Sequence, residues 1–120
     1  MKPLAVLAPG IDKGVITGAS VFEDAPFQKY KNYDNSFRGN MTIREATARS
    51  QNIPMVKAIA QIGPEKSMEF LRSVGISRLV DADNNLGLAL GGLTHGSNPL
   101  EMAGAYAAIA NDGVYIEPTF

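Results

Sequence analysis

The segment Ser50-Gln51-Asn52 places a hydroxyl and a carboxamide at a predicted corner between two helices. A serine hydroxyl can relay a proton, and an asparagine amide can donate and accept hydrogen bonds at the same time. On one turn the two side chains can face a single cleft. The structural alternative is that Ser50 and Asn52 cap helices, which both residue types commonly do. Spacing alone favours capping over chemistry.

Lys2 and His95 are the other single residues that could take part in catalysis. A catalytic lysine needs a buried ammonium with a lowered pKa, whereas a lone lysine near a terminus is usually solvated. His95 is the only histidine, and no Ser-His-Asp spacing accompanies it. We therefore interpret His95 as a surface or hydrogen-bonded loop residue.

Two further segments resemble ligand-binding motifs, a calcium loop and a phosphate loop, but each lacks residues that the motif requires. Residues 81–85 carry half of the acidic pattern of a calcium loop, without its glycine and terminal glutamate at the required offsets. Leu90-Gly91-Gly92 lacks the Lys-Ser/Thr pair of a phosphate loop. Because the chain also has no cysteine and a single histidine, we expect neither a metal nor a cofactor.

The composition restricts the classes of protein that remain. The 120 residues suffice for one small domain, and 45% of them are hydrophobic, enough for a core. A net charge of -1 argues against a dedicated nucleic-acid binder and against docking on anionic membranes. No apolar run approaches the roughly 18 residues of a membrane span, and the chain shows no targeting signal.

The second half of the chain is predicted to be mostly helical. Thr42 and Glu45 form a capping box that begins a helix ending near Arg49. Asn98, followed by Pro99 and Glu101, is the clearest signal in the chain for the start of a helix. That helix should end before Gly113. Two more helices are expected between them, over 54–62 and 64–74.

The remaining elements are predicted to be short. We expect a helix over Lys2–Ala8 that ends at Pro9-Gly10, and short strands at Val15-Ile16 and Ser20-Val21-Phe22 within a long loop over 11–41. A strand should begin at Val114-Tyr115-Ile116. The helix over 98–111 is apolar on two faces, which is typical of a helix buried against close neighbours.

A helix-turn-helix interpretation of residues 42–63 is one alternative function. Thr42-Ile43-Arg44-Glu45-Ala46 superficially resembles bacterial regulators of that class. The second helix carries only Lys57 as a charge, whereas contacts to phosphates and bases require several basic or amide side chains. A non-catalytic helical interaction module is the other form of this alternative.

Three segments taken in order resemble one family, the penicillin-binding proteins. They are Arg44-Glu45-Ala46 with Ala48–Lys57, then Leu88–Thr94 followed by Pro99–Ala107, and finally Asn111 with Gly113-Val114-Tyr115 and Pro118. Their order and spacing match the transpeptidase domain of the class A, bifunctional type. The resemblance covers nearly the whole chain and makes Ser50-Gln51-Asn52 its Ser-x-Asn motif.

The resemblance implies a fold and a chemistry. Residues 1–120 would be a single partial domain, the mostly helical part, with short β segments, of an α+β transpeptidase domain truncated at both ends. Lys2 would be the lysine of the Ser-x-x-Lys motif, with the nucleophilic serine three positions before it and outside this chain. Lys2 would take or hold the serine's proton, Ser50 would relay a proton to the leaving amine, and Asn52 would bind the substrate's amide backbone.

The resemblance also implies partners and a location. The intact domain would cross-link peptidoglycan stem peptides ending in D-Ala-D-Ala, would be acylated by β-lactams, and would work on the extracytoplasmic face of a bacterial membrane. We expect the chain alone to be inactive, because the nucleophilic serine and the Lys-Thr/Ser-Gly motif are both missing from it. We also expect its exposed apolar surfaces to produce a homo-oligomer or domain-swapped dimer, without nucleic-acid binding.

Overall fold

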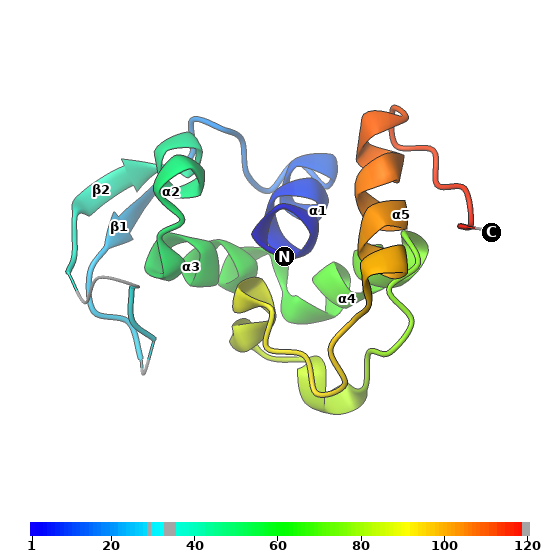
Figure 1. Ribbon diagram of the computed structural model, residues 1–120. Helices are drawn as coiled ribbons and strands as arrows, with labels where there is room; N and C mark the ends of the chain where they lie inside the picture. The colour runs from blue at the N-terminus through cyan, green and yellow to red at the C-terminus, as the bar shows by residue number, and fades with distance from the viewer. Residues whose placement is uncertain (29, 33–35, 119–120) are drawn as a thin grey trace.

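The computed structural model describes residues 1–28, 30–32 and 36–118. Its helices form one body with a small two-stranded sheet at one edge (Figure 1). In this view β1, β2 and α2 lie on the left, α5 and the C-terminal segment lie on the right, and the N-terminal helix lies between them (Figure 1). The fold is therefore mostly helical with two short strands, as predicted.

The elements follow one another in a simple order. The N-terminal helix has a π-helical part, Pro3–Leu7, and an α-helical part, α1, Ala8–Asp12. The strands β1, Val21–Asp24, and β2, Gly39–Thr42, pair antiparallel. The longer helices are α2, Ile43–Arg49; α3, Asn52–Ile62; α4, Pro64–Ser73; and α5, Pro99–Ala110. Two 3₁₀ turns, Asp81–Asp83 and Leu86–Leu90, lie between α4 and α5.

The central element is α3. It packs against β1, α2, α4, the N-terminal helix and the 3₁₀ turn Leu86–Leu90. Seven of its eleven residues are buried, as expected for a helix surrounded by apolar neighbours: Ile53, Pro54, Met55, Val56, Ala58, Ile59 and Ile62. A recognition helix of a DNA-binding motif needs a free face, so the burial of α3 counts against that alternative.

The starts of the two helices that have local N-cap signals were predicted correctly. The Thr42 hydroxyl accepts from the Glu45 N–H at 3.1 Å and begins α2. The Asn98 side chain accepts from the Glu101 N–H at 2.8 Å and begins α5. These bonds satisfy backbone donors that the first helical turn leaves free, so the sequence signal and the structural cause are the same.

The prediction that Pro9-Gly10 ends the first helix is wrong. Pro9 has no N–H, and its ring conflicts with the carbonyl one turn before it, which explains why this helix widens into π-helical geometry over Pro3–Leu7. The Ser67 hydroxyl of α4 donates to the Ala5 carbonyl, the acceptor that Pro9 cannot serve. Gly10 serves packing, since a Cβ there would lie 2.7 Å from Cγ1 of Ile16 and 2.8 Å from Cδ1 of Ile62.

The predicted strands are partly corrected as well. The N–H groups of Val15 and Ile16 both donate to the Gly10 carbonyl, at 2.9 and 3.2 Å, so this pair closes the helix instead of forming a strand. The predicted strand at 20–22 lies at 21–24, and its partner β2 lies within the segment predicted to be a loop. Val114-Tyr115-Ile116 forms no strand with the described part of the chain.

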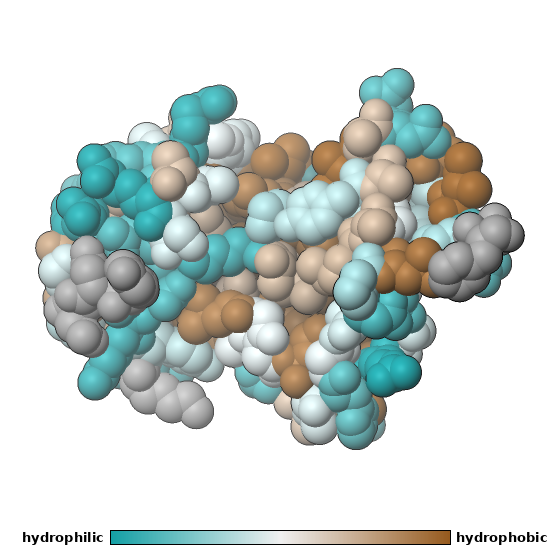
Figure 2. All heavy atoms as spheres, viewed as in Figure 1, coloured by the Kyte–Doolittle hydropathy of each residue, from teal (hydrophilic) through white to brown (hydrophobic). Residues whose placement is uncertain are grey.

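One face of α5 is covered and the other is not. Gly104, Ala105 and Ala108 are buried, whereas Tyr106 is 40% and Ile109 is 46% exposed. The helix is thus apolar on two faces but covered on one, and the exposed apolar side chains agree with the expectation of exposed apolar surface on this chain. In Figure 2 the left side of the molecule is mostly hydrophilic, and hydrophobic residues gather on the right, over and beside α5.

Candidate functional site

Lys2 and Ser50, far apart in sequence, meet in the structure. The Lys2 Nζ donates to the Ser50 hydroxyl at 2.8 Å and to the Ser50 carbonyl at 2.8 Å. The N-terminal helix supplies the lysine, and the turn between α2 and α3 supplies the serine. A proton can move directly between these two side chains, because their polar atoms are within hydrogen-bond distance.

The backbone at Ser50 is unusual for a serine. Its φ of 52° and ψ of 42° place it in the left-handed region, where it ends α2. A non-glycine residue in such a conformation costs about 1–3 kcal/mol and persists only where its surroundings hold it. The Gln51 N–H, which donates to the Ala46 carbonyl at 3.0 Å, is part of what holds this turn.

Lys2 is half-buried, and this burial has an electrostatic consequence. Removal of water disfavours the charged ammonium, so burial lowers the pKa of Lys2 from its ordinary value. No carboxylate of the described residues forms an ion pair with Lys2. A neutral amine is a proton acceptor, so this environment favours the form that could act as a general base.

A shallow pocket of about 280 Å³ opens beside the Lys2–Ser50 contact. Met1, Pro3, Thr47 and Leu90 line it together with the two polar residues. Three separate parts of the chain thus meet there: the N-terminal helix, the end of α2 and the 3₁₀ turn Leu86–Leu90. A substrate group in this pocket would contact the Ser50 hydroxyl.

Asn52, the third predicted site residue, does not line that pocket. Its Nδ2 donates to the Lys31 carbonyl at 2.8 Å. This bond fixes the orientation of the carboxamide and engages one of its two N–H groups. The structure thus brings Lys2 and Ser50 into contact and places Asn52 against the loop before β2.

Two buried polar residues behind Asn52 were not found from the sequence. The Asn32 Oδ1 accepts from the Asn52 N–H at 2.9 Å, and the Asn32 Nδ2 donates to Asp24 Oδ1 at 2.6 Å. Asp24 and Asn32 are only 1% and 3% exposed. No short sequence motif marks either residue, because their hydrogen-bond partners are distant in sequence and come near only in the folded chain.

The other candidate polar residues, His95 and Asp83, do not line the Lys2–Ser50 pocket. His95 is exposed. Asp83 is buried and accepts from the Val80 N–H and from the N–H and hydroxyl of Thr94, each at 2.8 to 3.0 Å. Burial alone would raise the pKa of Asp83, but these bonds lower it below its ordinary value. Within the described ranges no group of acidic, histidine or cysteine residues is arranged to hold a metal ion.

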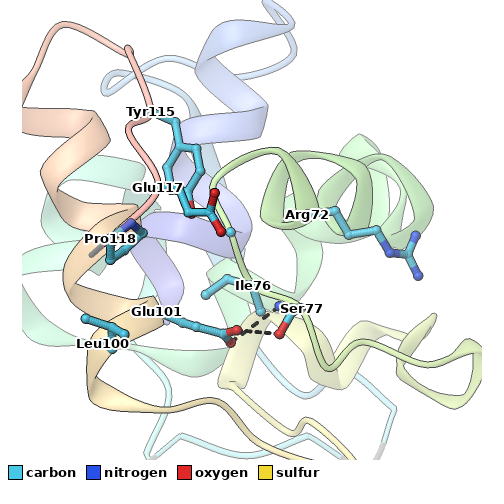
Figure 3. Close-up of a pocket in the computed structure, with 9 residues that line it drawn as sticks. Arg72, Ile76, Ser77, Leu100, Glu101, Tyr115, Glu117 and Pro118 are labelled. Carbon is cyan, nitrogen blue, oxygen red and sulfur yellow. Dashed lines mark hydrogen bonds between the residues drawn. The ribbon is translucent and has the colours of Figure 1, made fainter. Parts of the chain in front are cut away.

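A larger pocket of about 570 Å³ lies away from Lys2 and Ser50, between the end of α4 and the start of α5 (Figure 3). One of its two glutamates, Glu101, points toward Ser77 and accepts from it, which lowers the pKa of Glu101 (Figure 3). Arg72 extends away from both glutamates of the pocket (Figure 3). Glu101 is thus engaged in holding the segment before α5, and the pocket shows no paired groups for chemistry.

The chain matches a known domain over its whole length. The model of the penicillin-binding protein transpeptidase domain matches residues 1–120. Penicillin-binding protein 1F of Bacillus subtilis is 38% identical over 124 residues, which covers 99% of this chain and 17% of that protein. Penicillin-binding protein 1A of Clostridium botulinum is 36% identical over 131 residues, covering 98% of this chain and 16% of that protein.

A solved structure agrees with the sequence comparisons. Penicillin-binding protein 1A from Haemophilus influenzae superposes with a TM-score of 0.86 at 34% identity, over 98% of this chain and 18% of that one. The chain therefore spans less than a fifth of the length of these relatives. Within the described residues no helix is both long and apolar enough to cross a membrane. The match over all 120 residues and the agreement in fold show that this chain belongs to the penicillin-binding protein transpeptidase domain family.

Proposed function

We propose that these residues form the central part of a serine D,D-transpeptidase, which cross-links peptidoglycan stem peptides ending in D-Ala-D-Ala. The contact between Lys2 Nζ and Ser50 Oγ carries this proposal. The family resemblance assigns both residues to motifs of one active site, and the fold joins them across 48 positions of the chain. Residues 1–120 would then be a single partial domain.

The proposed reaction proceeds through an acyl-enzyme. A serine three positions before Lys2 would attack the carbonyl of the penultimate D-Ala, and Lys2 would take or hold the proton of that serine. The terminal D-Ala would leave with a proton relayed by Ser50. An amine of a second stem peptide would then attack the ester, form the cross-link and release the serine. Asn52 would hydrogen-bond the amide backbone of the peptide through the groups that Lys31 does not use.

The proposal extends to location and assembly. A transpeptidase of this kind would work on the extracytoplasmic face of a bacterial membrane, where its substrate is. β-Lactams would acylate the same serine, since they resemble D-Ala-D-Ala. A polypeptide of only residues 1–120 would be inactive and would associate through its apolar surfaces into a homo-oligomer or a domain-swapped dimer.

The first experiment reads the coding sequence across both ends of this chain and labels the full-length product with a fluorescent penicillin. We expect covalent labelling that unlabelled penicillin blocks. Ser50→Ala should slow acylation roughly 100-fold or more, because a proton relay in the transition state is worth that much. A polypeptide of residues 1–120 should take up no label.

Ser73→Ala is the matched control for Ser50→Ala. Ser73 also lies at the end of a helix and donates to a backbone carbonyl, that of Phe70 at 2.6 Å, but it does not line the Lys2–Ser50 pocket. Its variant should label at the wild-type rate. Absence of labelling in the full-length protein, or an unchanged rate in Ser50→Ala, would contradict the proposed function.

A further inference from the structure

Asp24 and Asn32 form a buried pair. Their side chains make hydrogen bonds to each other, to the loop before β2 and to the start of α3. The Asn32 Nδ2 donates to Asp24 Oδ1 at 2.6 Å and to the Ser36 carbonyl at 2.8 Å. Asp24 Oδ2 accepts from the Arg38 N–H at 2.9 Å. A buried carboxyl group is costly unless its oxygens are hydrogen-bonded, and both oxygens of Asp24 are. The pair is therefore a firm anchor.

Asn32 connects this anchor to α3. Its Oδ1 accepts from the N–H groups of Asn52 and Ile53, at 2.9 and 3.0 Å. These are the first two residues of α3, and Gln51, at the N-cap position, makes no side-chain capping bond. A residue distant in sequence thus replaces the local cap that most helices use.

The neighbour of Asn32 holds the Asn52 side chain. The Lys31 carbonyl accepts from Asn52 Nδ2 at 2.8 Å. The backbone and the carboxamide of Asn52 are thus fixed by two consecutive residues of the same loop. Because Ser50 lies two positions earlier, a shift in the start of α3 would also move the Ser50 carbonyl and hydroxyl away from Lys2.

We propose that Asp24 and Asn32 are a positioning pair for acyl transfer: they hold the Ser50–Asn52 turn so that Ser50 faces Lys2 and Asn52 presents its free amide groups to the peptide. This inference rests on the proposed transpeptidase function. Neither residue touches the substrate or the reacting atoms; both act through the start of α3. Small displacements of catalytic groups are costly, since an error of about 1 Å can lower a rate roughly 100-fold.

The test uses the full-length protein and a fluorescent penicillin as the probe. Asn32→Ala removes both the cap on α3 and the bond to Asp24. We expect the rate constant of acylation to fall roughly 10- to 100-fold, while the fraction of protein labelled at the end point stays at the wild-type value. A merely structural role would lower the labelled fraction or the midpoint of thermal unfolding and leave the rate constant of the folded molecules unchanged.

Asn98→Ala is the matched control. Asn98 is also an asparagine whose Oδ1 caps a helix, α5, through the Glu101 N–H at 2.8 Å. It does not line the Lys2–Ser50 pocket. Its loss should lower thermal stability and leave the acylation rate constant unchanged.

An exchange of the two side chains provides the conservative rescue. Asp24→Asn alone presents an amide N–H either to Asn32 Nδ2 or to the Arg38 N–H, and donors cannot bond donors. The double variant Asp24→Asn/Asn32→Asp restores the bond between the pair and keeps acceptors for Arg38 and for the start of α3; the bond from residue 32 to the Ser36 carbonyl is the one it loses. We expect the double variant to acylate faster than Asp24→Asn. This comparison also stands if Asn32→Ala does not fold.

The outcomes separate the two proposals. If the wild-type protein is not labelled, the transpeptidase function fails, and the positioning role fails with it. If the wild-type protein is labelled and Asn32→Ala acylates at the same rate, only the positioning pair is wrong. A double variant no faster than Asp24→Asn would also overturn the pairing.

Discussion

Lys2 shows how a single residue acquires chemical character from its surroundings. In an extended chain it would be a solvated ammonium. In the fold its Nζ donates to both oxygens of Ser50, and burial lowers its pKa. The two effects oppose each other in part, because the bonds to Ser50 oxygens favour the charged donor while desolvation favours the neutral amine. Desolvation is the cause of the lowered pKa of Lys2.

Replacement of Lys2 by arginine tests whether the neutral amine is needed. Arginine keeps the positive charge but does not lose its proton in proteins. In the full-length protein we expect Lys2→Arg to lower the acylation rate constant roughly 100- to 10,000-fold. Lys57→Arg is the control, since Lys57 also donates to a backbone carbonyl, that of Glu23 at 2.8 Å, and has no proposed role in the reaction.

The pH dependence of the wild-type rate follows from the same shift. A lowered pKa means that the neutral, proton-accepting form of Lys2 is populated at lower pH than for an ordinary lysine, whose pKa is about 10.4. The acylation rate should therefore rise with pH along a limb that lies below the ordinary lysine range. Labelling reactions quenched at a series of times and pH values measure how the acylation rate rises with pH. A rise that begins only at or above the ordinary lysine pKa range would refute the assignment of Lys2 as the base.

Among the secondary-structure elements, the N-terminal helix shows how a local defect is compensated by a neighbouring helix. Pro9 has no N–H to donate to the Ala5 carbonyl, and the Ser67 hydroxyl of α4 donates to this carbonyl. Both Ala5 and Ser67 are fully buried, so water cannot substitute. The bond ties α4 to the helix that carries Lys2.

Ser67→Ala should destabilise the protein by about 1–3 kcal/mol, because it leaves a buried carbonyl unsatisfied. Chemical denaturation of the folded protein measures this loss as a lower midpoint with an unchanged slope. Ser73→Ala removes a hydroxyl from the exposed end of the same helix and should change the free energy of unfolding much less. Equal effects of the two variants would contradict the role given to Ser67.

For the molecule as a whole, the notable feature is an apolar surface around α5. Ile11 of α1 and Ile109 of α5 line one groove and are 54% and 46% exposed. Val114 and Ile116, in the segment after α5, are 58% and 71% exposed. Contiguous apolar surface of this kind is uncommon on soluble monomers and usually marks an interface.

A polypeptide of residues 1–120 should therefore self-associate at micromolar concentration or above. Ile109→Lys places a charge in the groove and should shift the distribution toward monomer. Val21→Lys, at an exposed apolar residue in β1 at the opposite side of the molecule, should leave it unchanged (Figure 1). Sedimentation velocity distinguishes the outcomes, and a clean wild-type monomer would exclude association through this surface.

Local sequence signals were sufficient for α2, α4 and α5, for the end of α3 and for the turn at Ser50. Thr42 and Asn98 cap their helices within three residues, and Gly63 ends α3, so neighbouring residues contain the complete cause. The order of three motif segments was also sufficient to identify the family, because such spacing does not depend on knowing the contacts.

Long-range contacts decided the rest. The bond from Lys2 to Ser50 spans 48 positions, and the cap that Asn32 provides for Asn52 spans 20. Pro9 by itself predicts the end of a helix. In the structure the helix continues to Asp12, and the Ser67 hydroxyl donates to the Ala5 carbonyl, which Pro9 cannot do. In each case a polar group is satisfied by a partner that only packing brings near. The sequence therefore predicted the candidate site residues, and the tertiary structure determined which of them touch and what holds them in place.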